Sequence, residues 1–140
     1  MATYNRTVPV KFGWCDPAGI MFFPRYFELA NDTVEHWFGN PLGVSFKVLH
    51  ETMRLSVPTA RFEADFRAPS RLGDWIDIAL SIERLGNSSA TLRILMSCKG
   101  QARFDGRQVI VLTDGKTLKS KPWPDRLRGK MEKFVEAQAV

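Results

Sequence analysis

A long amphipathic segment dominates the first third of the chain. Large apolar residues recur there at helical spacing, which gives a helix one continuous apolar face. The residues of this face are Phe23, Tyr26, Phe27, Ala30, Val34, Trp37 and Phe38. Pro24 suits the first helical position, where a backbone N–H would have no intrahelical partner, and Gly39 is typical of a helix end. The pattern predicts a helix over residues 24–38 whose wide apolar face needs a covering layer.

Further along the chain the hydrophobic period changes from helical to two, the spacing of half-buried strands. The strands that this alternation predicts are residues 4–12, 60–66, 76–82, 90–98 and 109–113. Residues 40–53 give a mixed signal, which predicts an irregular connector with a short helical turn near residues 46–50. Asp105-Gly106 predicts a turn between the last two strands, and residues 125–135 predict a C-terminal helix.

These elements define a fold class. Short connections between successive strands favour antiparallel pairing. One long apolar helix together with one antiparallel sheet predicts a two-layer α+β domain in which the sheet curls around the helix. The chain has 140 residues, the size of one ordinary domain, so residues 1–140 are expected to form a single domain.

Composition narrows the functional classes. The chain is 44% hydrophobic and 25% charged, which is ordinary for a soluble globular protein, and no apolar run approaches the length of a membrane span. The first residues do not open a signal peptide, so we expect a cytoplasmic protein without a membrane partner. Cys15 and Cys98 lack metal-ligand spacing, so no metal is expected.

The formal net charge is +5, which fits either a slightly basic surface or attraction to an anionic ligand. Nucleic acid is not an expected partner, because no motif of interleaved basic and aromatic residues is present.

Asp16 is the acid whose position suits chemistry. A carboxylate can attack a carbonyl as a nucleophile or activate water as a general base. The predicted helix begins shortly after Asp16, and the N–H groups of Phe23, Arg25 and Tyr26 could bind a developing oxyanion. The alternative is that Asp-Pro-Ala-Gly is only a turn in which Asp16 caps its own backbone, and spacing alone favours this alternative.

The stretch from Phe12 to Tyr26, Phe-Gly-Trp-Cys-Asp-Pro-Ala-Gly-Ile-Met-Phe-Phe-Pro-Arg-Tyr, resembles the signature of the 4-hydroxybenzoyl-CoA thioesterase family of hotdog-fold proteins. The resemblance continues through the helix and later strands and spans nearly the whole chain. It implies the hotdog fold, a five- to six-stranded antiparallel sheet wrapped around one long central helix. It also implies homodimers that pair into tetramers, with active sites at the subunit interface.

The resemblance implies a hydrolase that cleaves an aromatic acyl-CoA like 4-hydroxybenzoyl-CoA, or a short- or medium-chain one, to free acid and CoA. No cofactor is expected, because CoA is part of the substrate. The family's catalytic carboxylate corresponds to Asp16, and the helix start that polarises the thioester carbonyl corresponds to Phe23, Arg25 and Tyr26. Residues expected to contact the acyl group are Phe22, Asn31, Val57 and Thr59. Residues expected to contact CoA are Arg84, Asn87, Ser88 and Lys121.

The sequence departs from the family pattern in two places. Asn31 stands where aryl-specific members can carry an acid facing the acyl ring, and residues 86–88 lack the basic side chains that some members use on CoA phosphates. The alternative function is a non-catalytic acyl-CoA-binding hotdog protein, because fold alone does not establish chemistry. A hotdog dehydratase is disfavoured, since no His is placed beside Asp16.

Overall fold

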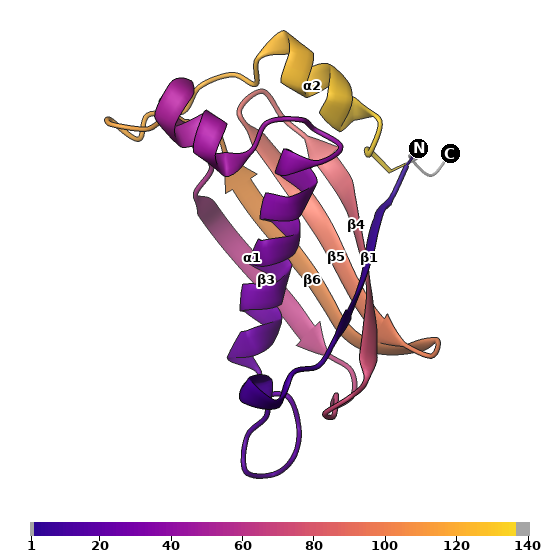
Figure 1. The fold of residues 1–140 in the computed structure, drawn as a ribbon. Helices are drawn as coiled ribbons and strands as arrows, with labels where there is room; N and C mark the ends of the chain where they lie inside the picture. The colour runs from indigo at the N-terminus through magenta and orange to yellow at the C-terminus, as the bar shows by residue number, and fades with distance from the viewer. Residues whose placement is uncertain (1, 137–140) are drawn as a thin grey trace.

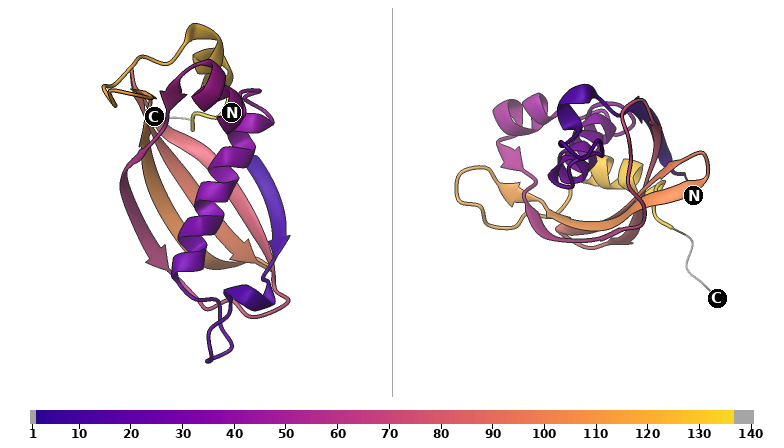
Figure 2. Two further views of the ribbon diagram at one scale, coloured as in Figure 1. Left: turned by 60° about the vertical axis from the view of Figure 1, so that its left-hand side comes forward. Right: turned by 90° about the horizontal axis from the view of Figure 1, so that it is seen from below.

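A curved antiparallel sheet holds one long helix against its concave face (Figures 1 and 2). The computed structural model describes residues 2–136. Its main sheet has five strands in the order β1-β4-β5-β6-β3, and every neighbouring pair is antiparallel. The strands are β1 (Tyr4–Pro9), β3 (Thr59–Phe66), β4 (Trp75–Leu85), β5 (Ser89–Cys98) and β6 (Gln101–Val111). The predicted α+β class, with an antiparallel sheet around a central helix, is confirmed.

The central helix α1 (Pro24–Gly39) begins at the predicted residue and ends one residue later than predicted. Trp37 and Phe38 are fully buried, with their rings edge-on to Phe134 and Phe46, and burial of a Phe side chain contributes about 1.5–3 kcal/mol. Phe23 is the exception to the predicted buried face, with 57% of its surface exposed. It precedes the helix as the N-cap residue and therefore lies at the open edge of the core.

The predicted turn at Asp105-Gly106 is wrong, because both residues lie inside β6. Gly106 is buried, and a Cβ at this position would lie 2.5 Å from Cε1 of Phe104. The glycine therefore allows a close approach of the Phe104 ring within a strand and does not reverse the chain. The reversal falls earlier, at Lys99 and Gly100, which both have positive φ angles.

The remaining elements are short. β1 ends before the predicted boundary, and the 3₁₀ turn η1 (Phe12–Trp14) follows it. The helical turn predicted near residues 46–50 is present. Residues 46 and 47 are helical and run directly into η2 (Val48–Thr52), a π-helical turn. β2 (Leu55–Ser56) pairs with β7 (Thr113–Asp114), and the second helix is α2 (Asp125–Glu132). α2 stops before residue 135, because Val135 pairs instead with Ile82 of β4. No helix within residues 2–136 is long and apolar enough to cross a membrane.

Different segments of the chain lie at the two ends of the sheet (Figure 1). At one end, which we call the Asp16 end, residues 10–22 meet the connection between β3 and β4 through a bridge from Ile20 to Arg71. At the other end, the α2 end, the β4–β5 turn lies beside the segment that leads into α2. β4 joins the two ends and has 11 residues, which at about 3.3 Å per residue gives about 36 Å.

Candidate active site

Asp16 lies in a tight loop that leads from η1 to α1. A bridge between Cys15 and Met21 closes the loop. Within it, the N–H of Gly19, which has φ of +80°, donates to the Asp16 carbonyl at 2.9 Å. The Asp16 side chain accepts a hydrogen bond at Oδ1 from the N–H of Ala18, also at 2.9 Å. The turn that the sequence offered as the alternative for Asp16 is therefore present.

The turn engages only half of the carboxylate. Oδ2 of Asp16 accepts no hydrogen bond and joins no ion pair within residues 2–136, and the side chain is half-buried. The hydrogen bond to Oδ1 fixes the orientation of the carboxylate. Oδ2 keeps its lone pairs free to attack a carbonyl carbon or to accept a proton. The capping role and a chemical role of Asp16 are thus compatible, because they use different oxygens.

The start of α1 offers one backbone donor and not three. The N–H groups of Arg25 and Tyr26 donate to the carbonyls of Phe22 and Phe23, at 2.9 and 3.1 Å, so the first turn of the helix already uses them. Pro24 has no N–H. The N–H of Phe23 donates to no acceptor within the described chain. Of the three N–H donors predicted at the helix start, only that of Phe23 is available to an oxyanion at the positive end of the helix dipole.

Exposed aromatic rings form a rim beside this helix start. Phe22, Phe23 and Phe66 are 47%, 57% and 46% exposed, although rings of this size are usually buried. Phe23 packs edge-on against both neighbours, with ring centroids 5.5 Å from Phe22 and 6.1 Å from Phe66. The rim joins the start of α1 to the end of β3, and its open ring faces can receive a flat apolar group.

The other residues predicted to contact the acyl group gather in one cavity farther along α1. Its volume is about 250 Å³ and its lining residues are Asn31, Val34, Phe46, His50, Ser56, Val57, Pro58, Thr59 and Ile110. Asn31, Val57 and Thr59 are therefore brought together, whereas Phe22 lies apart at the aromatic rim. Buried Gln108 lies behind the cavity, and its Nε2 donates to Thr59 Oγ1 at 2.8 Å and to Asn31 Oδ1 at 3.3 Å. The sequence did not indicate Gln108, because the turn expected at Asp105-Gly106 hid its place on the inner face of β6.

The residues predicted to contact CoA gather at the α2 end. The carbonyls of Asn87 and Ser88 accept hydrogen bonds from Trp123 at 3.0 Å and Leu112 at 2.7 Å, and the Leu112 carbonyl accepts one from Lys121 at 2.8 Å. Arg84 lies close to this group, at the end of β4. This end of the sheet is opposite to the Asp16 end. One chain therefore cannot bring its own Asp16 and these four residues to the same small molecule.

A second cavity at the α2 end has a basic lining. Its volume is about 720 Å³ and its lining residues are His50, Arg54, Leu55, Asp114, Gly115, Lys116 and Thr117. Asp114 Oδ1 accepts the N–H groups of Thr117 and Lys116 at 2.8 and 2.9 Å, and these bonds hold the pKa of Asp114 below its usual value. Neither Arg54 nor Lys116 has a carboxylate within ion-pair distance in residues 2–136. With two cations and one carboxylate in its lining, the cavity has a net positive charge, which suits an anion.

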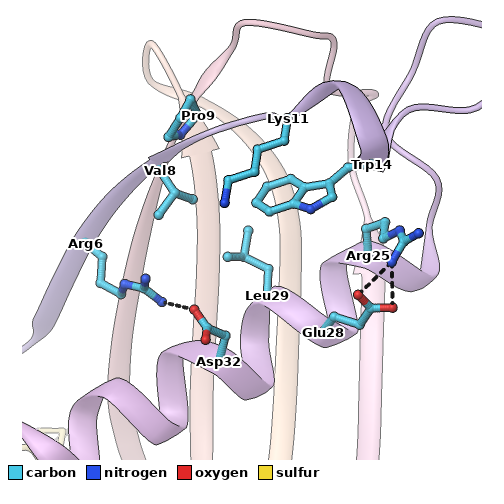
Figure 3. Close-up of a pocket in the computed structure, with 9 residues that line it drawn as sticks. All are labelled: Arg6, Val8, Pro9, Lys11, Trp14, Arg25, Glu28, Leu29 and Asp32. Atoms are coloured by element: carbon cyan, nitrogen blue, oxygen red, sulfur yellow. Dashed lines mark hydrogen bonds and ion pairs between the residues drawn. The ribbon is translucent and has the colours of Figure 1, made fainter.

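A cavity of about 470 Å³ on the opposite flank of α1 is not part of this arrangement (Figure 3). Its charged residues are already paired, since Arg6 lies 3.0 Å from Asp32 and Arg25 lies 2.9 Å from Glu28. Lys11 is placed over the Trp14 ring at 5.5 Å. Of the predicted site residues only Arg25 lines this cavity, and its guanidinium is bound to Glu28.

Comparison with known proteins gives a consistent result. Residues 10–131 match the family described as the thioesterase-like superfamily. A 1,4-dihydroxy-2-naphthoyl-CoA hydrolase from Synechococcus elongatus is 22% identical over 129 residues, which cover 91% of this chain and 94% of the relative. A thioesterase superfamily structure from Jannaschia sp. superposes with a TM-score of 0.89 at 27% identity, covering 97% of this chain and 95% of that one. The structure of a gentisyl-coenzyme A thioesterase gives a TM-score of 0.80 at 24% identity, covering 91% and 99%.

These matches confirm the predicted hotdog fold and the predicted enzyme class, while the narrower 4-hydroxybenzoyl-CoA branch is not distinguished from its neighbours. The chain belongs to the thioesterase-like superfamily and is a thioester hydrolase of the hotdog fold.

Proposed function

We propose that this protein hydrolyses the CoA thioester of a hydroxylated aromatic acid, with Asp16 as the catalytic carboxylate and the Phe23 N–H as the oxyanion donor. The observation that carries this proposal is that a carboxylate oxygen and a backbone N–H, close in sequence, both lack a hydrogen-bond partner. Asp16 Oδ2 and the Phe23 N–H have no partner within residues 2–136, and one tight loop connects them. A free acceptor on this loop and a free donor at the helix start that follows it suit the two sides of a reacting carbonyl.

Two routes use the same groups. In the first, Asp16 attacks the thioester carbon, CoA leaves as the thiolate, and water then cleaves the resulting mixed anhydride. In the second, Asp16 removes a proton from water, and the water attacks the same carbon directly. In both routes negative charge develops on the carbonyl oxygen, where the Phe23 N–H and the dipole of the 16-residue helix α1 oppose it. One such donor is worth about 2.7–4 kcal/mol. Neither route needs a cofactor.

An aromatic acyl group is supported by the surroundings of Asp16 and by the relatives. The rim of Phe22, Phe23 and Phe66 offers ring faces and edges to a flat substrate. The relatives named above act, by their names, on 1,4-dihydroxy-2-naphthoyl-CoA and on gentisyl-CoA. The cavity farther along α1 lies toward the α2 end, and its Asn31 amide and Thr59 hydroxyl provide polar groups for a ring hydroxyl of a substrate at the Asp16 end of a neighbouring chain. The 4-hydroxybenzoyl group suggested by the sequence is one member of this substrate class.

We further propose that the site is completed by a second copy of the chain. β3 is an edge of the sheet, because β6 is its one neighbour among the strands of residues 2–136, and an edge strand can pair with another strand. β3 runs from the α2 end to the Asp16 end. An antiparallel pairing of two β3 strands therefore sets the α2 end of each chain beside the Asp16 end of the other. The basic residues at the α2 end would then hold the CoA phosphates of the neighbouring site, and two such dimers could form the tetramer implied by the sequence.

A thiol-release assay over a panel of acyl-CoAs tests this function. We expect release of free CoA from hydroxybenzoyl-, gentisyl- and dihydroxynaphthoyl-CoA at rates well above those for aliphatic acyl-CoAs, and loss of release in Asp16→Asn. A non-catalytic binding protein would instead show ligand-induced thermal stabilisation without thiol release. Faster release from aliphatic substrates would contradict the aromatic assignment, and full release by Asp16→Asn would contradict the mechanism.

A further inference from the structure

Backbone contacts join the Asp16 loop to residues 69–74, the segment that leads into β4. The N–H of Met21 donates to the Ser70 carbonyl at 2.8 Å, and Ile20 forms a bridge with Arg71. The tip of the loop, residues 17–19, is exposed. The position of Asp16 relative to the Phe23 N–H therefore depends on how firmly residues 69–74 are held.

Ser70 is held by the helix and the sheet together. It is fully buried, and its Oγ accepts a hydrogen bond from the Tyr26 hydroxyl at 2.8 Å. The Nη1 of Arg103 lies 3.2 Å from the same oxygen and donates to the Pro69 carbonyl at 2.9 Å. Tyr26 belongs to the first turn of α1, and Arg103 belongs to β6. These contacts thus connect the helix start, the sheet and the base of the Asp16 loop.

An ion pair completes this support. Arg103 Nη1 lies 2.8 Å from Asp74 Oδ2, and the same oxygen accepts the N–H of Arg71 at 2.9 Å. The hydrogen bond from Arg103 is the main reason why the pKa of Asp74 is lowered. The Asp74 carbonyl also accepts the N–H of Val10 at 2.8 Å, which fixes the connection to the segment after β1. Arg103 is 8% exposed, so its bonds are largely shielded from solvent.

We infer that Arg103 is a positioning residue for Asp16 and acts through Ser70 and Asp74. This inference rests on the proposed catalytic role of Asp16. One guanidinium nitrogen of Arg103 binds both ends of residues 69–74. The Ser70 carbonyl in turn accepts the N–H of Met21, and this bond holds the Asp16 loop in place. Arg103 touches neither Asp16 nor the Phe23 N–H, so its effect is on geometry. A displacement of about 1 Å at a reacting group can cost about 100-fold in rate.

The activity test compares two arginines of the same strand. In Arg103→Met we expect kcat to fall about 10- to 100-fold with KM changed by less than about twofold, because the substrate contacts remain while Asp16 is misplaced. Arg103→Lys should restore part of kcat, since it keeps the charge beside Asp74. Arg107→Met is the control: it removes an ion pair of similar length, 2.9 Å to Glu83, which does not contact the Asp16 loop, and it should leave kcat unchanged.

A second readout does not depend on activity. Amide hydrogen exchange in residues 18–22 should be faster in Arg103→Met than in Arg107→Met, while exchange in β4 and β5 stays as in the parent. Ser70→Ala removes only the shared hydroxyl, and it should show the same change to a smaller extent even if Arg103→Met does not fold. Unchanged exchange in these loop amides, or equal loss of kcat in Arg103→Met and Arg107→Met, would overturn the inference. Failure of the catalytic proposal is seen separately, as full activity in Asp16→Asn.

Discussion

The two ends of the sheet differ in chemistry, and neither end holds all of the residues predicted for the site. The Asp16 end carries a carboxylate, an unused backbone donor and exposed aromatic rings. The α2 end carries cations without acid partners in the described chain, around a cavity of about 720 Å³. The first set suits an acyl carbon and a ring, and the second suits phosphates. The difference supports the proposal that this thioester hydrolase divides its site between opposite ends of one sheet, which would become neighbours if two chains paired along the β3 edge.

The largest effect is expected at the Asp16 end. Asp16→Asn keeps the side-chain oxygen that accepts from Ala18, so the loop should stay folded, but it removes the charge needed for attack or proton transfer. We expect kcat to fall roughly 10²- to 10⁴-fold. Steady-state thiol release measures the loss, and size-exclusion chromatography with light scattering serves as the control for an unchanged oligomer. Hydrolysis close to that of the parent protein would remove Asp16 from the mechanism.

A complementation experiment tests whether the two ends of different chains meet. One variant carries Asp16→Asn, and the other carries Lys116→Ala, Lys121→Ala and Arg54→Ala at the α2 end. Each alone should be poorly active. After unfolding and refolding together, mixed dimers should contain one site with both intact halves, and activity should recover above the sum of the two separate proteins. No recovery, although mass spectrometry shows mixed dimers, would mean that each site is built from one chain.

A smaller effect is expected from single cations at the α2 end. Lys121→Ala should raise KM about 2- to 5-fold without lowering kcat, because an exposed charge–phosphate contact is worth less than about 1 kcal/mol. The increase should shrink at high salt, where such contacts are screened. Lys133→Ala is a matched control, since Lys133 is also exposed and lies beyond α2. Equal changes in the two variants would argue against a phosphate site at Lys121.

An effect of similar size is expected on the choice of acyl group. Asn31→Asp keeps an oxygen for the Gln108 amide and adds a charged acceptor at the cavity that Asn31 lines. A hydrogen bond to a charged group is about 1 kcal/mol stronger than one between neutral groups, so kcat/KM for hydroxybenzoyl-CoA relative to benzoyl-CoA should rise about fivefold. The ratio of the two substrates is measured in one competition assay. An unchanged ratio would place the ring hydroxyl away from Asn31.

The sequence predicted the parts of the fold that repeat along the chain. The helical spacing of apolar residues found α1 to within a residue, and the alternation of period two found β3, β4 and β5. It failed at Gly106, because a glycine that makes room for the Phe104 ring looks in sequence like a glycine that makes a turn. As a result only residues 109–113 were predicted as the last strand, and the place of Gln108 in β6 was missed.

The candidate site was predicted less completely, for a physical reason. Asp16 could be identified because the motif around it and the helix that follows are contiguous in sequence. Arg103 was not visible, because its partners Ser70 and Asp74 lie 33 and 29 residues away and leave no periodic signal. The occupied N–H groups of Arg25 and Tyr26 depend on the pitch of the first helical turn, which side-chain pattern does not report.

The free edge of β3 has a practical consequence. If the catalytic acid and the phosphate-binding cations of each site come from different molecules, the fraction of working sites follows mass action. Specific activity should then decline when the enzyme is diluted below the dissociation constant of the pair and return when it is concentrated again. Apparent inactivity in a very dilute assay would reflect separated chains, and saturating substrate could partly reverse it by bridging them.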